Sequence, residues 1–359
     1  MYLKLVRQPN NFVGKDVQTM FLPFTMIQYI MFSPRYCIKR NLITPNSIFI
    51  KLLSICVMFA LIFSVIHRNI VLPFYKDLDG TRLHGIVVYY DCLFSCSRFI
   101  IIFIVTVIQS KSNIQFVLCF QKVHNFLNNV VEFKRYIVWN WISVVGVSCF
   151  MVVYLTAFYV YLELAFIWAY SWYFFIFFDI NILYFIRVLK LLEDKVVLWN
   201  IQALQSLDGK RRGRFNHKEL FKSYVDILET YNNNNRTFQI FYLYFILELF
   251  THALVYIQAA IEIMKRSVIL NFDKAAVISA SVCFWLCKDL IWQTILTRQC
   301  EKLYLAFQTV PDSCTLILES NCSDAERKLY KNVLRLHRAS FSKIRVCSLF
   351  YVDAALQLS

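Results

Sequence analysis

Glycine and proline are scarce in this chain, which has only six of each among its 359 residues. The sequence contains no glycine-rich phosphate loop, no Gly-x-Ser-x-Gly nucleophile elbow and no His-Glu-x-x-His zinc motif. We therefore expect no enzymatic activity, no cofactor and no bound metal. Transporters with broken spanning helices usually need more glycine or proline within their spans, where Gly146 stands alone here.

A secretory leader and a disulfide framework are also missing. Residues 1–16 are polar and basic, without the short apolar block that precedes a cleavage site. The twelve cysteines fall in apolar stretches or in segments that we expect in the cytoplasm, so no disulfide is predicted. Cys92 with Cys96, and Cys283 with Cys287, have one-turn helical spacing, which favours close helix packing over a two-helix metal site.

Apolar residues are what the chain has in excess. They make up 58% of the sequence and the mean hydropathy is +0.52, whereas soluble domains are roughly 45–50% apolar. A spanning helix needs about 20 mostly apolar residues. Six segments satisfy this: 47–67, 85–110, two within 136–187 that fold back near Glu163, 238–262 and 275–297. The predicted fold is therefore all-α, a polytopic membrane bundle with six visible spans.

Basic residues predict the orientation of these spans. Segments on one side of the predicted membrane hold 29 lysine and arginine residues, and segments on the other side hold 6. Because positively charged loops stay in the cytoplasm, we expect a cytoplasmic N-terminus in a multi-pass plasma-membrane protein. The glycosylation sequons at Asn235 and Asn321 would then be unused. The net charge of +15 is explained by this topology, so no nucleic-acid partner is expected.

Three regions follow from the predicted topology. They are a cytoplasmic N-terminal segment at 1–46, a six-helix transmembrane bundle with cytoplasmic helix extensions at 47–310, and an anchor helix with the start of an incomplete last span at 311–359. Apolar spacing extends the fourth span through 188–205 and predicts a further helix over 217–231. Another helix is predicted over 323–345, with Ser323 as its N-cap and Glu326 three residues on. We expect these helices to pack into one cytoplasmic layer.

A stripe of polar residues marks the fifth span. Tyr244, Glu248, His252 and Tyr256 recur every four residues, so they share one face of a helix. Lipid tolerates such residues poorly, and this face is expected to point into the bundle. Together with Asp91 of the second span, the stripe predicts a polar wall of a ligand cavity in the outer half of the bundle.

Internal ion pairs that only stabilise packing are the alternative explanation for the charges within spans. Asp91 shares a face of the second span with Arg98, which is one such arrangement. Lys288 of the sixth span is predicted to neutralise Asp179 or Glu248, as a structural pair.

Aromatic rings with polar tips gather in the outer halves of the spans. Such side chains suit a small-molecule site, although tryptophan and tyrosine also collect at membrane interfaces. The residues that complete the predicted ligand site are Tyr154, Tyr159, Trp172, Tyr173 and Trp285.

The segment before the first span carries a resemblance to a known family. It reads FLPFTMIQYIMFSPRY at 21–36 and enters the first span through ITPNS at 43–47. This pattern, the predicted inside N-terminus and the basic second cytoplasmic loop resemble insect gustatory receptors, especially those of moths and butterflies. The resemblance covers nearly the whole chain, and it lies more in architecture than in any one string.

The resemblance implies a ligand-gated cation channel subunit that senses a small-molecule tastant, in a tetramer with identical or different receptor subunits. A bitter compound is favoured over a sugar, because a sugar site needs several carboxylates and amides beside its rings. The family carries Thr-Tyr followed by Gln-Phe in a seventh span that lines the ion pathway, and no such motif is present here. Residues 347–359 are too few to span, so we expect that helix to be truncated or missing and the chain to be silent alone. An insect olfactory receptor or a secondary transporter is the alternative.

Overall fold

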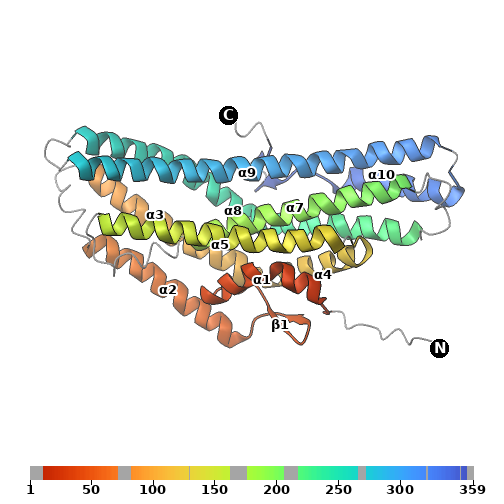
Figure 1. Ribbon diagram of the computed structural model, residues 1–359, viewed down its shortest axis with the longest axis horizontal. Coiled ribbons are helices and arrows are strands. Elements are labelled where there is room, and N and C mark those ends of the chain that lie inside the picture. The colour runs from red at the N-terminus through yellow and green to blue at the C-terminus, as the bar shows by residue number, and fades with distance from the viewer. Residues whose placement is uncertain are drawn as a thin grey trace.

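The computed structural model describes residues 11–71, 82–128, 130–161, 176–205, 217–265, 272–320, 322–347 and 349–353. Helices dominate this part of the chain (Figure 1). They are α1 (Lys15–Ile30), α2 (Ile48–Val71), α3 (Arg82–Phe103), the π-helix η2 (Ile104–Ile108), α4 (Ser110–Phe126), α5 (Val130–Tyr161), α7 (Ile176–Gln205), α8 (His217–Lys265), α9 (Phe272–Glu319) and α10 (Asp324–Ser340). Two small antiparallel hairpins, β1 (Cys37–Lys39) with β2 (Leu42–Thr44) and β3 (Arg345–Val346) with β4 (Phe350–Tyr351), complete the fold.

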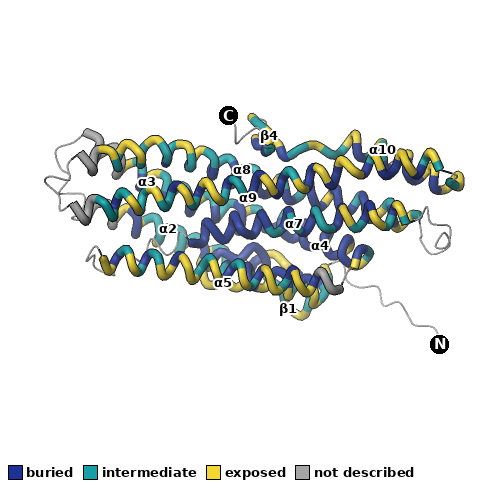
Figure 2. The backbone as a smooth tube through the Cα atoms, turned by 45° about the horizontal axis from the view of Figure 1, so that its top comes forward, coloured by how far each residue is buried: buried dark blue, intermediate teal, exposed yellow. Residues whose placement is uncertain are grey.

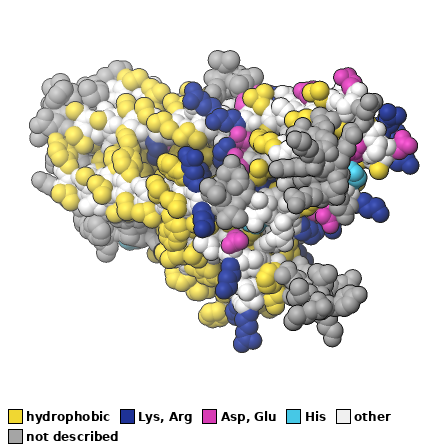
Figure 3. Space-filling view, turned by 45° about the vertical axis from the view of Figure 1, so that its right-hand side comes forward, with side chains coloured by type: hydrophobic (Ala, Val, Ile, Leu, Met, Phe, Trp, Pro, Cys, Tyr) yellow, Lys and Arg dark blue, Asp and Glu magenta, His cyan; other side chains and the backbone are white. Residues whose placement is uncertain are grey.

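Five helices in the described residues are long and apolar enough to cross a membrane. Their spans are Ile48–His67 in α2, Tyr89–Ile108 across α3 and η2, Phe133–Tyr161 in α5, His217–Ile261 in α8 and Ala276–Glu319 in α9. Large apolar side chains stand outward on them, such as Phe63 and Val153, each 68% exposed. Figure 3 shows hydrophobic side chains covering one end of the molecule, with the charged side chains beyond it. This surface suits lipid, and the protein is an all-α bundle embedded in a membrane.

The predicted fourth span corresponds to α7, which is not among these five helices. Four charged residues, from Asp179 to Glu193, occur within its first 18 residues. Helix α7 tolerates them because it lies at the centre of the bundle, where every residue from Ile176 to Ile186 is buried (Figure 2). The preceding stretch, 162–175, lies outside the described residues, and so does the predicted turn near Glu163. The fourth predicted span, and with it the total of six, is therefore untested.

Beyond the apolar end, the long helices continue into a helical extension made of α4, α10 and the adjoining parts of α7, α8 and α9 (Figure 1). The predicted continuation of the fourth span through 188–205 is confirmed. The helix predicted over 217–231 is part of α8, which runs unbroken for 49 residues. Helix α9 likewise runs unbroken through Pro311, so no break in the chain marks the expected boundary at residue 310.

Packing in the extension is dense and largely aromatic. Trp199 of α7 is fully buried and donates a hydrogen bond from Nε1 to the carbonyl of Leu220 at 2.9 Å. The last helix, α10, begins with the predicted capping box, in which Ser323 and Glu326 satisfy each other's backbone N–H groups. Its apolar face, with Leu329 and Val333 buried, packs against α8 and α9. The structure confirms that these helices pack into one layer, as predicted. Its location in the cytoplasm stays a prediction.

Two helices were not expected from the sequence. Helix α1 lies across α5 and α7 and carries Pro23 in its interior. Helix α4 follows the π-helix η2 and packs along α8. Thr106 within η2 shares a 2.5 Å hydrogen bond with Ser33, which links the N-terminal segment to η2.

Candidate functional site: a polar network inside the bundle

The polar stripe of α8 points into the bundle, as its four-residue spacing predicts. Glu248 and His252 are only 2% and 3% exposed. On the opposite face of the same helix, Phe250 and Leu254 are 63% and 59% exposed. The helix therefore presents its polar side to protein and its apolar side to lipid.

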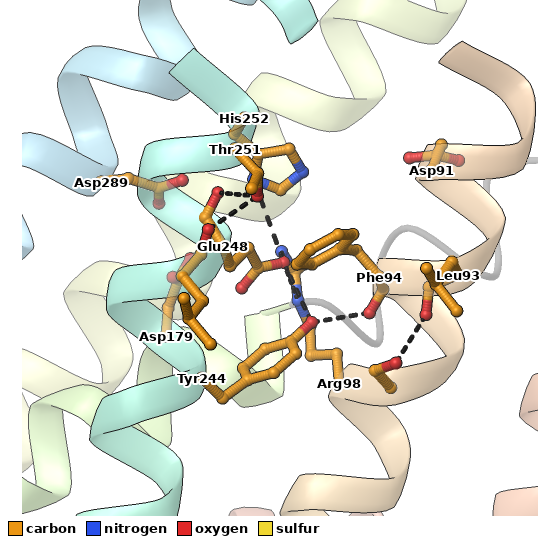
Figure 4. A network of polar contacts seen from close by, with 12 residues as sticks. Asp91, Leu93, Phe94, Arg98, Asp179, Tyr244, Glu248, Thr251, His252 and Asp289 are labelled. Carbon is orange, nitrogen blue, oxygen red and sulfur yellow. Dashed lines mark hydrogen bonds and ion pairs between the residues drawn. The ribbon is translucent and has the colours of Figure 1, made fainter. Parts of the chain in front are cut away.

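The centre of the network is an ion pair between α3 and α8 (Figure 4). Arg98 donates two hydrogen bonds to Oε1 of Glu248, one of them from Nε at 3.1 Å. Tyr244 donates to the carbonyl of Phe94 at 2.6 Å and lies 3.3 Å from the same Glu248 oxygen. The guanidinium of Arg98 also stacks over Phe178 of α7 at 4.9 Å. Three helices thus meet around one buried carboxylate.

A second ionic group joins α7 to α9. Lys288 bonds both carboxylate oxygens of Asp179, at 2.9 and 3.0 Å, and lies 2.8 Å from Asp289. Its ammonium also stands 4.4 Å above the ring of Trp285. The prediction that Lys288 neutralises Asp179 or Glu248 is confirmed for Asp179.

A group of aromatic side chains from α3 and α8 forms the third part of the network. The rings of His252 and Tyr256 stack at 4.7 Å, and Tyr90 meets both edge-on at 5.3 and 6.1 Å. Tyr90 and Thr251 share a hydrogen bond of 2.7 Å, while Tyr256 donates to Oδ1 of Asp91 at 3.1 Å. Every ring in this group therefore carries a polar atom beside its apolar face.

The structure brings together four of the predicted ligand-site residues: Asp91, Glu248, His252 and Tyr256. Trp285 lies beside Lys288 of the second ionic group. Tyr154 stands apart on α5, where it bonds Ser281 at 2.8 Å and stacks on Phe284 of α9. Tyr159 is buried on α5, about one and a half turns further along. Trp172 and Tyr173 lie outside the described residues.

Sequence reasoning missed two aromatic members, Tyr90 and Phe94. Both belong to α3 and follow helical spacing, and their rings lie 4.5 Å apart. Their position next to Asp91 was a signal that could have identified them. The sequence alone does not separate them from Tyr89, the preceding residue, which is 79% exposed.

The helical extension holds two buried histidines. Burial, and then the ammonium of Lys195 at 3.4 Å from Nδ1, lowers the pKa of His124 to about 4. Burial also lowers the pKa of His337, whose Nδ1 is hydrogen-bonded to the hydroxyl of Tyr224 at 2.6 Å. Both rings are therefore neutral at pH 7. No group of three or more histidine, cysteine or acidic residues suited to a metal ion occurs within the described part of the chain.

The sequence was also compared with known proteins. No protein-family model matches the chain, and no curated protein matches it.

Proposed function

We propose that this protein is a chemosensory receptor subunit of the insect gustatory type, a ligand-gated cation channel subunit that senses a small-molecule tastant. The support from sequence is the resemblance of the segments at 21–36 and 43–47 to that family. The support from structure is the polar network of α3, α7, α8 and α9, which lies among helices long and apolar enough to span a membrane.

One observation carries the proposal most strongly. His252 is buried on the inward face of α8, yet its Nδ1 has no hydrogen-bond partner. A buried polar atom without a partner costs roughly 1–3 kcal/mol, and a purely structural stripe would avoid that cost. A ligand that forms a hydrogen bond with Nδ1 of His252 would remove this free-energy cost. The unpaired atom is therefore consistent with a binding role.

The proposed topology follows the charge asymmetry of 29 to 6. It places the N-terminus and the helical extension in the cytoplasm and the Tyr90, His252 and Tyr256 end of the network toward the outside. An external tastant would then reach the aromatic group first and the Arg98–Glu248 pair behind it. Association of the extensions into a tetramer, and the plasma membrane as the location, belong to the same proposal.

The test separates ligand potency from protein abundance. His252→Ala and Tyr256→Ala are each expressed in cells that also contain partner receptor subunits. A tastant panel is applied, and the half-maximal concentration is recorded beside the amount of protein at the cell surface. We expect potency to fall on the order of tenfold or more, equivalent to about 1.4 kcal/mol, while surface amount changes little.

The matched control is Leu254→Ala, which removes an exposed apolar side chain from the opposite face of α8. It should alter neither quantity. If the stripe variants reduce surface amount and response in equal proportion, the stripe is structural and the receptor proposal loses its site. A proton-coupled flux without channel current would favour a secondary transporter instead.

A further inference from the structure

We propose that the ligand of this site is an organic cation, a protonated amine attached to an apolar or aromatic body. The inference rests on the proposed function, since it names the chemical class of ligand for the same network. Three observations support it: the balance of buried charge, the hydrogen-bonding groups of the site and the arrangement of its rings.

Buried charge in the network is out of balance toward the negative. In the described residues, three carboxylates, those of Asp179, Glu248 and Asp289, share two cations. Lys288 serves both aspartates, and Arg98 serves Glu248. A surplus negative charge away from water is costly unless a cation or a proton offsets it. A cationic ligand would supply that charge.

The hydrogen-bonding groups of the site are mainly acceptors. Asp91 adds a fourth buried carboxylate, about two helical turns along α3 from Arg98. Nδ1 of His252 is buried without a partner and lies 4.0 Å from Oε1 of Glu248. As a neutral imidazole nitrogen it can accept a hydrogen bond. An ammonium group, which has donors and no acceptor, complements this set, whereas a sugar hydroxyl brings an acceptor with each donor.

The rings around these acceptors suit a cation and its apolar body. Tyr90, Phe94, His252 and Tyr256 pack together, with centroid separations from 4.5 to 6.1 Å. The face of an aromatic ring attracts a cation, by about 0.5–2 kcal/mol depending on desolvation. The structure already uses this interaction, because Lys288 stands over Trp285 and Arg98 over Phe178.

The experiment compares a cation with a neutral molecule of the same shape. The full chain is reconstituted in lipid nanodiscs, and equilibrium binding is measured for phenethylamine, for benzyltrimethylammonium as a permanent cation, and for neutral 2-phenylethanol. We expect both cations to bind, and the alcohol to bind at least tenfold more weakly.

Charge removal at one position then tests the source of the preference. Asp91→Asn should weaken binding of both cations about tenfold and leave the alcohol unchanged. Asp91→Glu, which keeps the charge, should restore cation binding, and this rescue excludes misfolding as the cause. The matched control is Asp226→Asn, a buried carboxylate of α8 in the helical extension, which should have no effect.

Two results would overturn the inference. Equal binding of cations and alcohol, unaffected by Asp91→Asn, would show that protons offset the surplus charge, and the site would then take neutral tastants, leaving the proposed function intact. Absence of cation binding by the unaltered protein would also reject this ligand class. The proposed function would fall separately, if tastant responses were insensitive to His252→Ala and Tyr256→Ala.

Discussion

Arg98 of α3 and Glu248 of α8, 150 residues apart in sequence, form a salt bridge whose two side chains are each at most 7% exposed. Neither charge would be stable alone among apolar helices. The pair therefore fixes the rotation of α8 about its axis relative to α3. As a result His252 and Tyr256, on the same face of α8, also point toward α3. The geometry of the site depends on the Arg98–Glu248 salt bridge. Removal of the salt bridge should therefore affect stability and ligand binding separately.

Breaking the Arg98–Glu248 pair from one side should destabilise the protein strongly. Arg98→Met leaves a buried carboxylate uncompensated, which costs about 3–5 kcal/mol in buried pairs. The double variant Arg98→Met with Glu248→Leu should recover most of this stability, because both charges are then gone. Thermal unfolding in nanodiscs measures the effect. Equal losses in the single and double variants would contradict a direct pairing.

Removal of Lys288 should lower the free energy of unfolding more than removal of a partly exposed lysine that also pairs with two carboxylates. Lys288→Met leaves two aspartates, Asp179 and Asp289, close together without their shared cation. Lys190 is the matched control, since it pairs with Glu193 and Asp194 at a partly exposed position of α7. We expect a loss of about 3 kcal/mol or more for Lys288→Met and below about 1 kcal/mol for Lys190→Met. Similar losses would show that the buried group has no special role.

Acid should loosen the helical extension through His124. Its pKa is lowered to about 4 in the folded protein by burial and by Lys195, against an ordinary value of 6.5. Between these values the unfolded chain binds a proton that the folded protein does not, so stability falls as pH drops from 6.5 toward 4. His337, whose pKa is also lowered by burial, acts in the same direction.

Amide hydrogen exchange of α4 and α10 at pH 7 and pH 5 measures this loosening. Exchange should be faster at pH 5 in the unaltered protein. His124→Phe replaces the ring with one that cannot be charged, beside the rings of Phe120 and Phe133. The variant should lose much of the pH dependence in α4, and an unchanged pH dependence there would contradict the assignment.

Glycosylation reports the orientation in the membrane. The sequons at Asn235 and Asn321 belong to the side that the basic residues place in the cytoplasm, so both should remain unmodified in microsomes. A sequon introduced between residues 266 and 271, on the opposite side, should be modified and serves as the positive control. Modification of Asn235 would reverse the topology and with it the direction from which a ligand enters.

The parts of the site that could be predicted from the sequence are those fixed by one helix alone. Tyr244, Glu248, His252 and Tyr256 share a face because of helical spacing, whatever their neighbours are. The choice of partner could not be predicted in this way, because Lys288 had Asp179 and Glu248 within plausible reach. Helix rotation and depth decide between them, and these arise from packing many residues apart.

The unexpected helices have a related cause. Helix α1 contains Pro23 and has no strong segregation of apolar residues, so its own sequence indicates a helix weakly. Helix α4 mixes polar and apolar residues in nearly equal number, yet Val117, Phe120 and Val123 are almost completely buried against other elements. Tertiary contacts stabilise both helices, and these contacts cannot be predicted from the apolar periodicity of each segment alone.

The most direct test of the ligand site is covalent labelling by a photoreactive analogue of a tastant that binds the protein. After illumination, mass spectrometry identifies the labelled peptides, with and without excess unmodified tastant. The account predicts labels within residues 244–256 of α8 and 90–98 of α3, lost on competition. Competed labels confined to the helical extension, for example to α10, would show that the ligand binds elsewhere and that the polar stripe is structural.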